Sequence, residues 1–244
     1  MPETAPNIGP VPSLRSLSGM FTIASFFAIV GGYLDAYSYL ARGHVFANAQ
    51  TGNVVLFGAH AAAGNWTSAW KTLPSILAFM CGVAVARLLR VRSQKQTFRA
   101  TLICQALELL VLLVLLFFGR FVSDFCAVPL IAFSAALQNT SFSNVGPWQF
   151  NSAMTTSNLR NAVSGWVQLA LGETDSELRG KAIVGSVILL CFAAGALLGG
   201  VCTLRLPTYP LLPVVVLAAA GMLLTMRERS QRRNRDEAWI QGGC

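Results

Sequence analysis

Charged side chains are scarce in this sequence. Only 11% of its 244 residues are Asp, Glu, Lys or Arg, whereas 54% are hydrophobic. Water-soluble domains carry about 25% charged residues, so this composition does not supply the polar surface of a protein that folds in water. The apolar residues form long blocks, and about 20 consecutive apolar residues are needed for a helix to cross a bilayer. Because no water there satisfies backbone groups, we expect a multi-pass α-helical membrane protein.

Histidines and paired cysteines are also scarce. The only histidines are His44 and His60, and none of the six cysteines forms a Cys-x-x-Cys pair. The sequence contains neither Gly-x-Ser-x-Gly nor His-Glu-x-x-His. These absences argue against a zinc centre, a disulfide framework and the familiar intramembrane proteases. We therefore expect no metal, no cofactor and no enzymatic activity, with hydrolysis by an unfamiliar set of residues as the remaining alternative in this class.

Six hydrophobic blocks are predicted to span the membrane. They comprise residues 19–41, 72–89, 100–118, 125–145, 182–204 and 209–226. Two helix-like segments, 54–64 and 159–171, follow the first and fourth spans and are too short or too polar to cross alone. The predicted membrane domain is thus 19–226, between an N-terminal tail (1–18) and a basic C-terminal tail (227–244).

The positive charges predict the orientation of these spans. If six spans alternate, fourteen of the eighteen Lys and Arg residues fall on the side of the two termini. Because positive residues accumulate on the cytoplasmic side, both termini are expected in the cytoplasm. The same rule accounts for the net charge of +8 without a nucleic-acid partner. Membrane lipid is the expected partner, and a homo-oligomer such as a dimer is an open alternative.

The chain contains a weak internal repeat. The aligned positions are Asp35 with Asn139, Phe46 with Phe150, Thr51-Gly52-Asn53 with Thr156-Ser157-Asn158, and Phe79-Met-Cys-Gly82 with Phe192-Ala-Ala-Gly195. Each unit, about 19–118 and 125–226, holds three predicted spans, so the second unit must be inverted in the membrane. Inverted repeats with interrupted helices are a recurring construction of secondary transporters. Duplication of a stable helical unit without transport is the alternative.

Two acidic residues lie inside predicted spans. An ionised carboxylate at the depth of Asp35 costs about 2.5–3.5 kcal/mol on translocon scales. We expect Asp35 to be protonated, to pair with Arg42 or His44, or to face an aqueous cavity, and to couple protons or orient a substrate. The alternative is a buried acid capped by local donors. Glu108 in the third span either carries protons or ions, or anchors helix packing.

Two polar segments, 42–53 and 146–158, occupy corresponding positions in the two repeats. Asn53 and Asn158 each precede a helix-like run and are predicted N-caps. Helix starts present free N–H groups and suit anionic or polar ligands, above all where two of them re-enter the membrane and face each other. Surface loops followed by interfacial helices are the alternative. The candidate binding residues are Asp35, His44, Asn48, Gln50, Thr51, Gly52, Asn53, Asn139, Gln149, Asn151, Thr155, Thr156, Ser157 and Asn158.

Several of these motifs are also distinctive of a family. They are Gly-Tyr-Leu-Asp35-Ala, the stretch 45–58 (VFANAQTGNVVLFG), Phe79-Met-Cys-Gly82 and Gln138-Asn139. Together they resemble the YoaK-like family of uncharacterised bacterial multi-pass membrane proteins, over roughly residues 19–226. Gln50 is a minor departure, because Met or a similar residue is more usual there. The resemblance implies the bacterial cytoplasmic (inner) membrane and this architecture, and it implies no substrate.

The favoured hypothesis is a secondary transporter of a small polar or anionic solute, with Asp35 and Glu108 as candidates for proton or ion coupling. Its fold is expected to be six transmembrane helices in two inverted three-helix repeats, with re-entrant or interrupted segments after helices one and four. A non-transporting scaffold or accessory subunit and a passive channel are the alternatives, and an intramembrane enzyme is less favoured.

Overall fold

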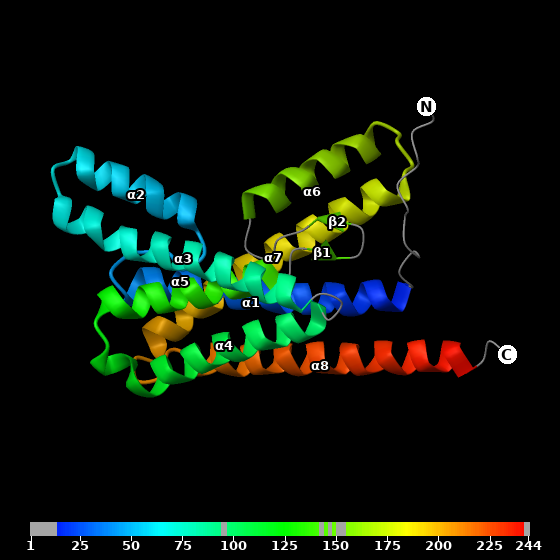
Figure 1. Ribbon diagram of the computed structural model, residues 1–244. Coiled ribbons are helices and arrows are strands. Elements are labelled where there is room, and N and C mark those ends of the chain that lie inside the picture. Colours follow the sequence, from blue (N-terminus) through cyan, green and yellow to red (C-terminus); the bar gives the residue numbers. More distant parts are fainter. Residues whose placement is uncertain (1–13, 94–96, 142–143, 146–147, 150–154, 242–244) are drawn as a thin grey trace, which may run out of the picture.

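The computed structural model describes residues 14–93, 97–141, 144–145, 148–149 and 155–241. These residues form α1 (Leu14–Ala41), α2 (Gln50–Ala62), α3 (Trp66–Arg92), α4 (Thr97–Phe118), the 3₁₀ turn η1 (Gly119–Phe121), α5 (Asp124–Ser141), β1 (Asn144–Val145), β2 (Trp148–Gln149), α6 (Thr155–Ala170), α7 (Ser176–Arg205) and α8 (Leu212–Gln241). The two-residue strands β1 and β2 pair antiparallel. The described fold is otherwise helical, as the sequence predicts (Figure 1).

Four described helical segments are long and apolar enough to cross a membrane. They are Gly19–Ala41, Trp66–Arg92, Phe98–Phe121 and Leu178–Arg205. The outer surface agrees with this assignment, because Leu190, Leu197 and Leu204 on α7 are between 67% and 72% exposed. These leucines recur every seven residues, so they lie on one face of the helix, where a membrane protein contacts lipid. The molecule is therefore a multi-pass helical membrane protein.

The remaining two predicted spans differ from the helices observed. The fourth was expected to reach residue 145, but α5 ends at Ser141, and residues 144 and 145 pair with β2 instead. Pro147 follows closely, and a proline disfavours helix in the residue before it. The sixth span was expected at 209–226, whereas α8 begins at Leu212 and continues as a charged helix to Gln241.

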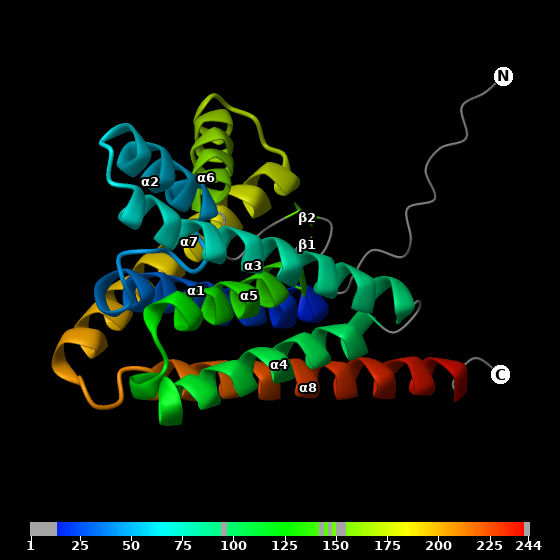
Figure 2. The same ribbon diagram turned by 60° about the vertical axis from the view of Figure 1, so that its left-hand side comes forward.

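The helices pack in a regular set of pairs. The most extensive contacts are between α1 and α7 and between α3 and α5, and α2 and α6 fold back on α3 and α7 respectively. In addition, α4 contacts α5 and α8, while α8 contacts α1. Figures 1 and 2 show the long helices running along a common direction, with α1 beginning and α8 ending at the same end of the bundle.

Glycines permit the closest of these helix contacts. The Cα of Gly195 on α7 packs directly on the carbonyl of Ile29 on α1, with no space for a side chain. On α3, a Cβ atom at Gly82 would lie 2.6 Å from the carbonyl oxygen of Phe133 on α5. Helices in membranes associate by close packing of small residues, because lipid supplies no hydrophobic driving force between them. These contacts therefore determine how α1–α7 and α3–α5 pair.

Replacing either contact glycine by alanine should destabilise the protein. Gly82→Ala and Gly195→Ala place a methyl group against backbone atoms, and such overpacking typically costs about 1–3 kcal/mol. Gly58→Ala is the matched control, because nothing lies within 4 Å of a Cβ atom there and α2 should gain from better helix propensity. Thermal unfolding of the detergent-solubilised protein measures this, and equal midpoints for all three variants would contradict the packing described.

Candidate functional site

The carboxylate of Asp35 on α1 is held by the backbone of the loop 42–49. Its Oδ1 accepts a hydrogen bond of 2.6 Å from the N–H of Asn48, and the backbone N–H groups of Ala47 and Ala49, on either side of Asn48, also favour the charged carboxylate electrostatically. Successive N–H groups of this kind form a concave anion site. Here the anion is a side chain of the same chain, which is 6% exposed. Asp35 thus anchors the loop, in agreement with the alternative of a buried acid capped by local donors.

The expected pairing of Asp35 with Arg42 or His44 is wrong. That expectation placed the two basic residues about two turns beyond Asp35 on a helix that continues past them, but α1 ends at Ala41. His44 has a positive φ of 60°, is exposed, and places its ring against Tyr39 at a centroid distance of 5.1 Å. The change of chain direction after Ala41 therefore carries both basic residues away from the carboxylate.

Asn48 connects α1 to α5. Besides donating its backbone N–H to Asp35, it accepts a 3.0 Å hydrogen bond at Oδ1 from Nδ2 of Asn139. Its own Nδ2 donates to the carbonyl of Gly31 at 3.0 Å. Asp35 and Asn139, the residues aligned by the internal repeat, therefore meet through Asn48. Oδ1 of Asn139 and Oε1 of the neighbouring Gln138 are buried and have no hydrogen-bond partner among the described residues.

Asn53 is not the N-cap of α2, as was predicted, but the fourth residue of the helix. The N-cap position is Ala49, whose side chain cannot cap. The fully buried amide of Asn53 accepts from the N–H of Phe46 at 2.9 Å and donates to the carbonyl of Phe46 at 2.8 Å and to Oε1 of Gln50 at 2.9 Å. Ser75 on α3 donates to the same carbonyl at 3.1 Å. Asn53 thus pairs with the loop backbone as a neighbouring strand would.

The remaining candidates of the first polar segment, Thr51 and Gly52, lie on the first turn of α2. Thr51 is exposed on the first turn of α2. Gly52 packs against the ring of Phe46, with 3.1 Å between a Cβ position and the ring. Neither residue touches Asp35 or Asn139 through a recorded hydrogen bond within the described part of the chain.

The second polar segment is described only from Thr155 onward and in β2. Thr155, Thr156, Ser157 and Asn158 form the first turn of α6, so the predicted N-cap role of Asn158 is wrong as well. Asn158 is the fourth residue of α6, as Asn53 is of α2, and only 2% of its surface is exposed. Asn151 and the side chain of Gln149 lie outside the described residues.

The two short helices start close to each other. In Figure 1, α2 runs from the middle of the bundle to the left and α6 runs from the middle to the right. Figure 2 also shows their N-terminal turns lying toward each other. The first N–H groups of a helix have no acceptor within the helix and carry a partial positive charge. The arrangement thus brings two electropositive helix ends to the middle of the molecule.

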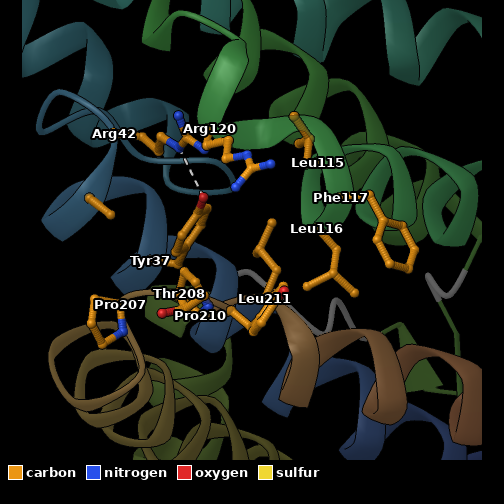
Figure 3. A pocket seen from close by; sticks show the side chains of 12 residues that line it. Tyr37, Arg42, Leu115, Leu116, Phe117, Arg120, Pro207, Thr208, Pro210 and Leu211 are labelled. Carbon is orange, nitrogen blue, oxygen red and sulfur yellow. Dashed lines mark hydrogen bonds between the residues drawn. The ribbon is translucent and has the colours of Figure 1, made fainter.

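A cavity of about 510 Å³ lies at the end of the bundle opposite the start of α1 and the end of α8. It is lined by Tyr37, Ala41, Arg42, Leu115, Leu116, Phe117, Arg120, Pro207, Thr208, Tyr209, Pro210 and Leu211. Figure 3 shows Arg42 and Arg120 at one edge of the cavity, across from Pro207 and Thr208. The lining therefore combines two guanidinium groups with an apolar wall.

Arg42 joins the end of α1 to the start of α5. Its guanidinium donates to the hydroxyl of Tyr37 at 2.9 Å and to the carbonyl of Gly119 at 2.8 Å. It also donates to the carbonyl of Val122 at 3.3 Å and forms a salt bridge of 3.2 Å with Asp124. Its side chain is only 14% exposed, so these partners compensate for lost hydration.

Arg120 is the cavity residue that sequence reasoning missed. It is exposed, and its guanidinium lies 4.6 Å from the ring centroid of Phe121. The distribution of positive charge could have indicated Arg120, because Arg42 and Arg120 are two of the four basic residues predicted on the side of the membrane away from the termini. Nothing in the sequence indicates that both line one cavity, since 78 positions separate them.

Comparison with known proteins assigns the chain to a family. Residues 23–224 match the family described as "Protein of unknown function (DUF1275)". The chain belongs to this family. The UPF0700 transmembrane protein YoaK of Bacillus subtilis (strain 168) is 28% identical over 142 residues, which cover 57% of this chain and 63% of that relative. The match therefore spans less than two thirds of the relative.

The comparisons confirm the resemblance to YoaK-like membrane proteins. The relative is named as a transmembrane protein, in agreement with the four apolar helical segments described in this chain. No solved structure matches the chain.

Removing the amide of Asn53 should loosen the loop 42–49 in this DUF1275 protein. Asn53→Ala leaves the buried N–H of Phe46 without its side-chain acceptor, and each unsatisfied buried group costs about 1–3 kcal/mol. Thr51→Ala, on the exposed side of the same helical turn, is the control. We expect a clearly lower thermal midpoint for Asn53→Ala and little change for the control; equal midpoints would disprove the role assigned to Asn53.

Proposed function

We propose that the protein is a secondary transporter of a small polar or anionic solute, built from two inverted three-span halves. The first half comprises α1–α4 and the second α5–α8, with α2 and α6 as re-entrant half-helices. The solute site lies between α1, α5 and the facing starts of α2 and α6. The observation that carries this proposal is the packing symmetry of the two halves.

Exchanging the two halves maps the main helix contacts onto one another. The α1–α7 pair becomes α5–α3, the α2–α3 pair becomes α6–α7, and the α1–α8 pair becomes α5–α4. The α4–α8 and α1–α5 contacts map onto themselves, as contacts across a twofold axis must. Among the described helix pairs, the small α3–α4 contact lacks an equally large counterpart. This pattern supports the inverted repeat inferred from sequence.

Individual contacts support the same symmetry. Gly82 and Gly195 are aligned by the sequence repeat, and each packs on a backbone carbonyl of the partner helix. Those carbonyls belong to Phe133 and Ile29, which are separated by 104 residues, the same offset that relates Asn139 to Asp35. The two glycine contacts are therefore equivalent under exchange of the halves. A twofold axis in the membrane plane allows a central site to open to either side.

Transport is favoured over simple duplication by the polar groups near this axis. Oδ1 of Asn139 and Oε1 of Gln138 are buried acceptors without a described partner. Buried polar groups inside membrane proteins are costly and mark substrate or ion pathways. Acceptor oxygens need a ligand with N–H or O–H donors, whereas the two helix starts favour negative charge. A small organic anion that carries such donors, for example a hydroxy- or amino-carboxylate, satisfies both requirements.

The cavity at the end of the bundle adds a second argument for an anion. It is lined by Arg42 and Arg120, and Asp124 neutralises only one of these two charges. Clefts lined by one sign of charge concentrate ligands of the opposite sign. Because fourteen of the eighteen basic residues fall on the side of the termini, we place this cavity on the outer face of the bacterial cytoplasmic membrane. It is then the entrance through which the solute arrives.

A ligand screen tests the proposal directly. Purified protein is heated with carboxylates, purines, sugars and inorganic anions, and a ligand at 100 times its dissociation constant should stabilise the folded state by about 2.7 kcal/mol. A hit is then followed by uptake into proteoliposomes. Asn139→Ala should remove both the thermal shift and uptake, whereas Asn65→Ala, an exposed amide at the start of α3, should retain both. No hit across the panel would count against a transporter, whereas uptake unchanged in Asn139→Ala would count against the proposed solute site.

Charge at the entrance should affect substrate affinity more than turnover. Arg120→Gln should raise the KM for an anionic solute several-fold at low salt with little change in kcat, because steering acts on arrival. The difference should shrink at high salt, where the charges are screened. Arg205→Gln, at the end of α7 and outside the cavity lining, is the control. An Arg120→Gln variant with unchanged KM would exclude the cavity as the entrance.

A non-transporting scaffold or accessory subunit is the second candidate. The observation in its favour is an apolar surface on α6, where Leu159, Val163, Trp166 and Val167 are each about half exposed. These residues share one helix face and would suit a partner helix or lipid. In that case the screen would yield no ligand, and Asn139→Ala would be silent while changes on this face would impair function.

A further inference from the structure

The structure contains a second buried acid whose surroundings are unlike those of Asp35. Glu108 on α4 is 1% exposed, and its Oε1 has no hydrogen-bond partner among the described residues. The salt bridge recorded in the described part of the chain joins Arg42 to Asp124, so no described cation forms one with Glu108. An ionised carboxylate in this position would be buried without compensation.

None of the described residues donates a hydrogen bond to Oε1 of Glu108. On its own helix, Gln105 lies one turn earlier and donates Nε2 to Oγ1 of Thr225 on α8 at 2.9 Å. Thr225 in turn donates to the carbonyl of Gly221 at 3.0 Å. The amide N–H of Gln105 and the hydroxyl of Thr225 therefore already donate to other acceptors. Oε1 of Gln105 is a second buried acceptor without a described partner. Oε1 of Gln105 and Oε1 of Glu108 are thus two buried acceptors on α4 without a described donor.

The charged and titratable groups on the neighbouring helices are directed elsewhere. Arg90 on α3 interacts electrostatically with the thiol of Cys104, and Ser141 on α5 interacts with the same thiol through its hydroxyl. Glu228 on α8 packs against Gly19 at the start of α1. On α4, the thiol of Cys104 is the titratable group that interacts with Glu108, and it brings no positive charge.

The contrast with Asp35 separates two kinds of acid. Asp35 accepts a hydrogen bond from the backbone N–H of Asn48, which stabilises a carboxylate anion. Oε1 of Glu108 accepts none from the described residues, and only the neutral carboxylic acid brings an O–H donor of its own into such a site. Pairs of acids whose surroundings favour opposite protonation states divide roles between them.

We propose that Glu108 is a proton-binding site distinct from the Asp35 site, and that it holds its proton as a neutral acid on α4, one turn beyond the contact that Gln105 makes with α8. This contact lies between the two halves, because α4 belongs to the first and α8 to the second. Separation of α4 from α8 would admit water, which accepts the proton and hydrates the carboxylate left behind. The coupling of proton release to solute movement rests on the proposed transport function, whereas proton binding itself does not.

Infrared spectroscopy of the full chain in a detergent without ester groups tests the protonation state. A neutral carboxylic acid has a C=O stretching band well separated from those of carboxylates and amides. At neutral pH the wild-type protein should show this band, Glu108→Gln should lack it, and Asp35→Asn should retain it. A band that persists in Glu108→Gln, or one that disappears in Asp35→Asn, would overturn the proposal.

Dicyclohexylcarbodiimide provides a second measurement that needs no variant. A protonated carboxyl adds across a C=N bond of the reagent, and the adduct rearranges to a stable N-acylurea that peptide mapping by mass spectrometry locates. We expect modification of Glu108 to exceed that of Asp35 by about tenfold or more, since an unpartnered buried carboxylate is strongly disfavoured. Equal modification, or modification of Asp35 alone, would contradict the assignment even where Glu108→Gln fails to fold.

Transport assays separate this inference from the proposed function. For a solute found in the ligand screen, Glu108→Gln should lose accumulation driven by a pH gradient while keeping exchange of labelled for unlabelled solute. An infrared band assigned to Glu108 in a protein that transports nothing would retain the proton site and reject the transporter. Accumulation unchanged in Glu108→Gln would reject the coupling role.

Discussion

The chain leaves the helical conformation inside the bundle, and the backbone groups of the loop 42–49 must find partners there. Buried irregular backbone is tolerated only where other groups satisfy its N–H and C=O groups. Several side chains meet this requirement: Asp35 accepts the N–H of Asn48, Asn53 binds both the N–H and the carbonyl of Phe46, and Ser75 donates to the same carbonyl. The position of α2, and with it the candidate site, depends on these bonds.

Close backbone contacts at Gly82 and Gly195 complete the framework, because they set how α3 meets α5 and how α7 meets α1. Each contact joins one half of the chain to the other. The interface between halves therefore combines close contacts of small residues with side-chain hydrogen bonds. The Asn48–Asn139 bond and the Gln105–Thr225 bond cross the same interface at two different places.

The buried acids show how identical chemistry acquires different roles. Both Asp35 and Glu108 lie on apolar helices, and both are almost completely buried. One accepts a hydrogen bond from the N–H of a loop residue, whereas Oε1 of the other has no hydrogen-bond partner among the described residues. Hydropathy and charge patterns in the sequence do not distinguish the two residues. Their difference arises from segments that are distant along the chain, so only the folded arrangement separates them.

The sequence by itself determined the helical membrane class, the family, the short helices after the first and fourth predicted spans, and the alignment of Asp35 with Asn139. These follow from local composition and spacing, because about 20 apolar residues suffice to specify a helix that crosses a bilayer. Tertiary structure decided where α2 and α6 begin, why Asn53 is buried rather than a cap, and which groups Arg42 binds. Those outcomes depend on contacts such as Asn53 with Phe46 and Arg42 with Gly119, which form only after the chain reverses at Ala41 and the helices pack. Hydrogen-bond partners are chosen by proximity in space, and sequence spacing determines proximity only within a single helix.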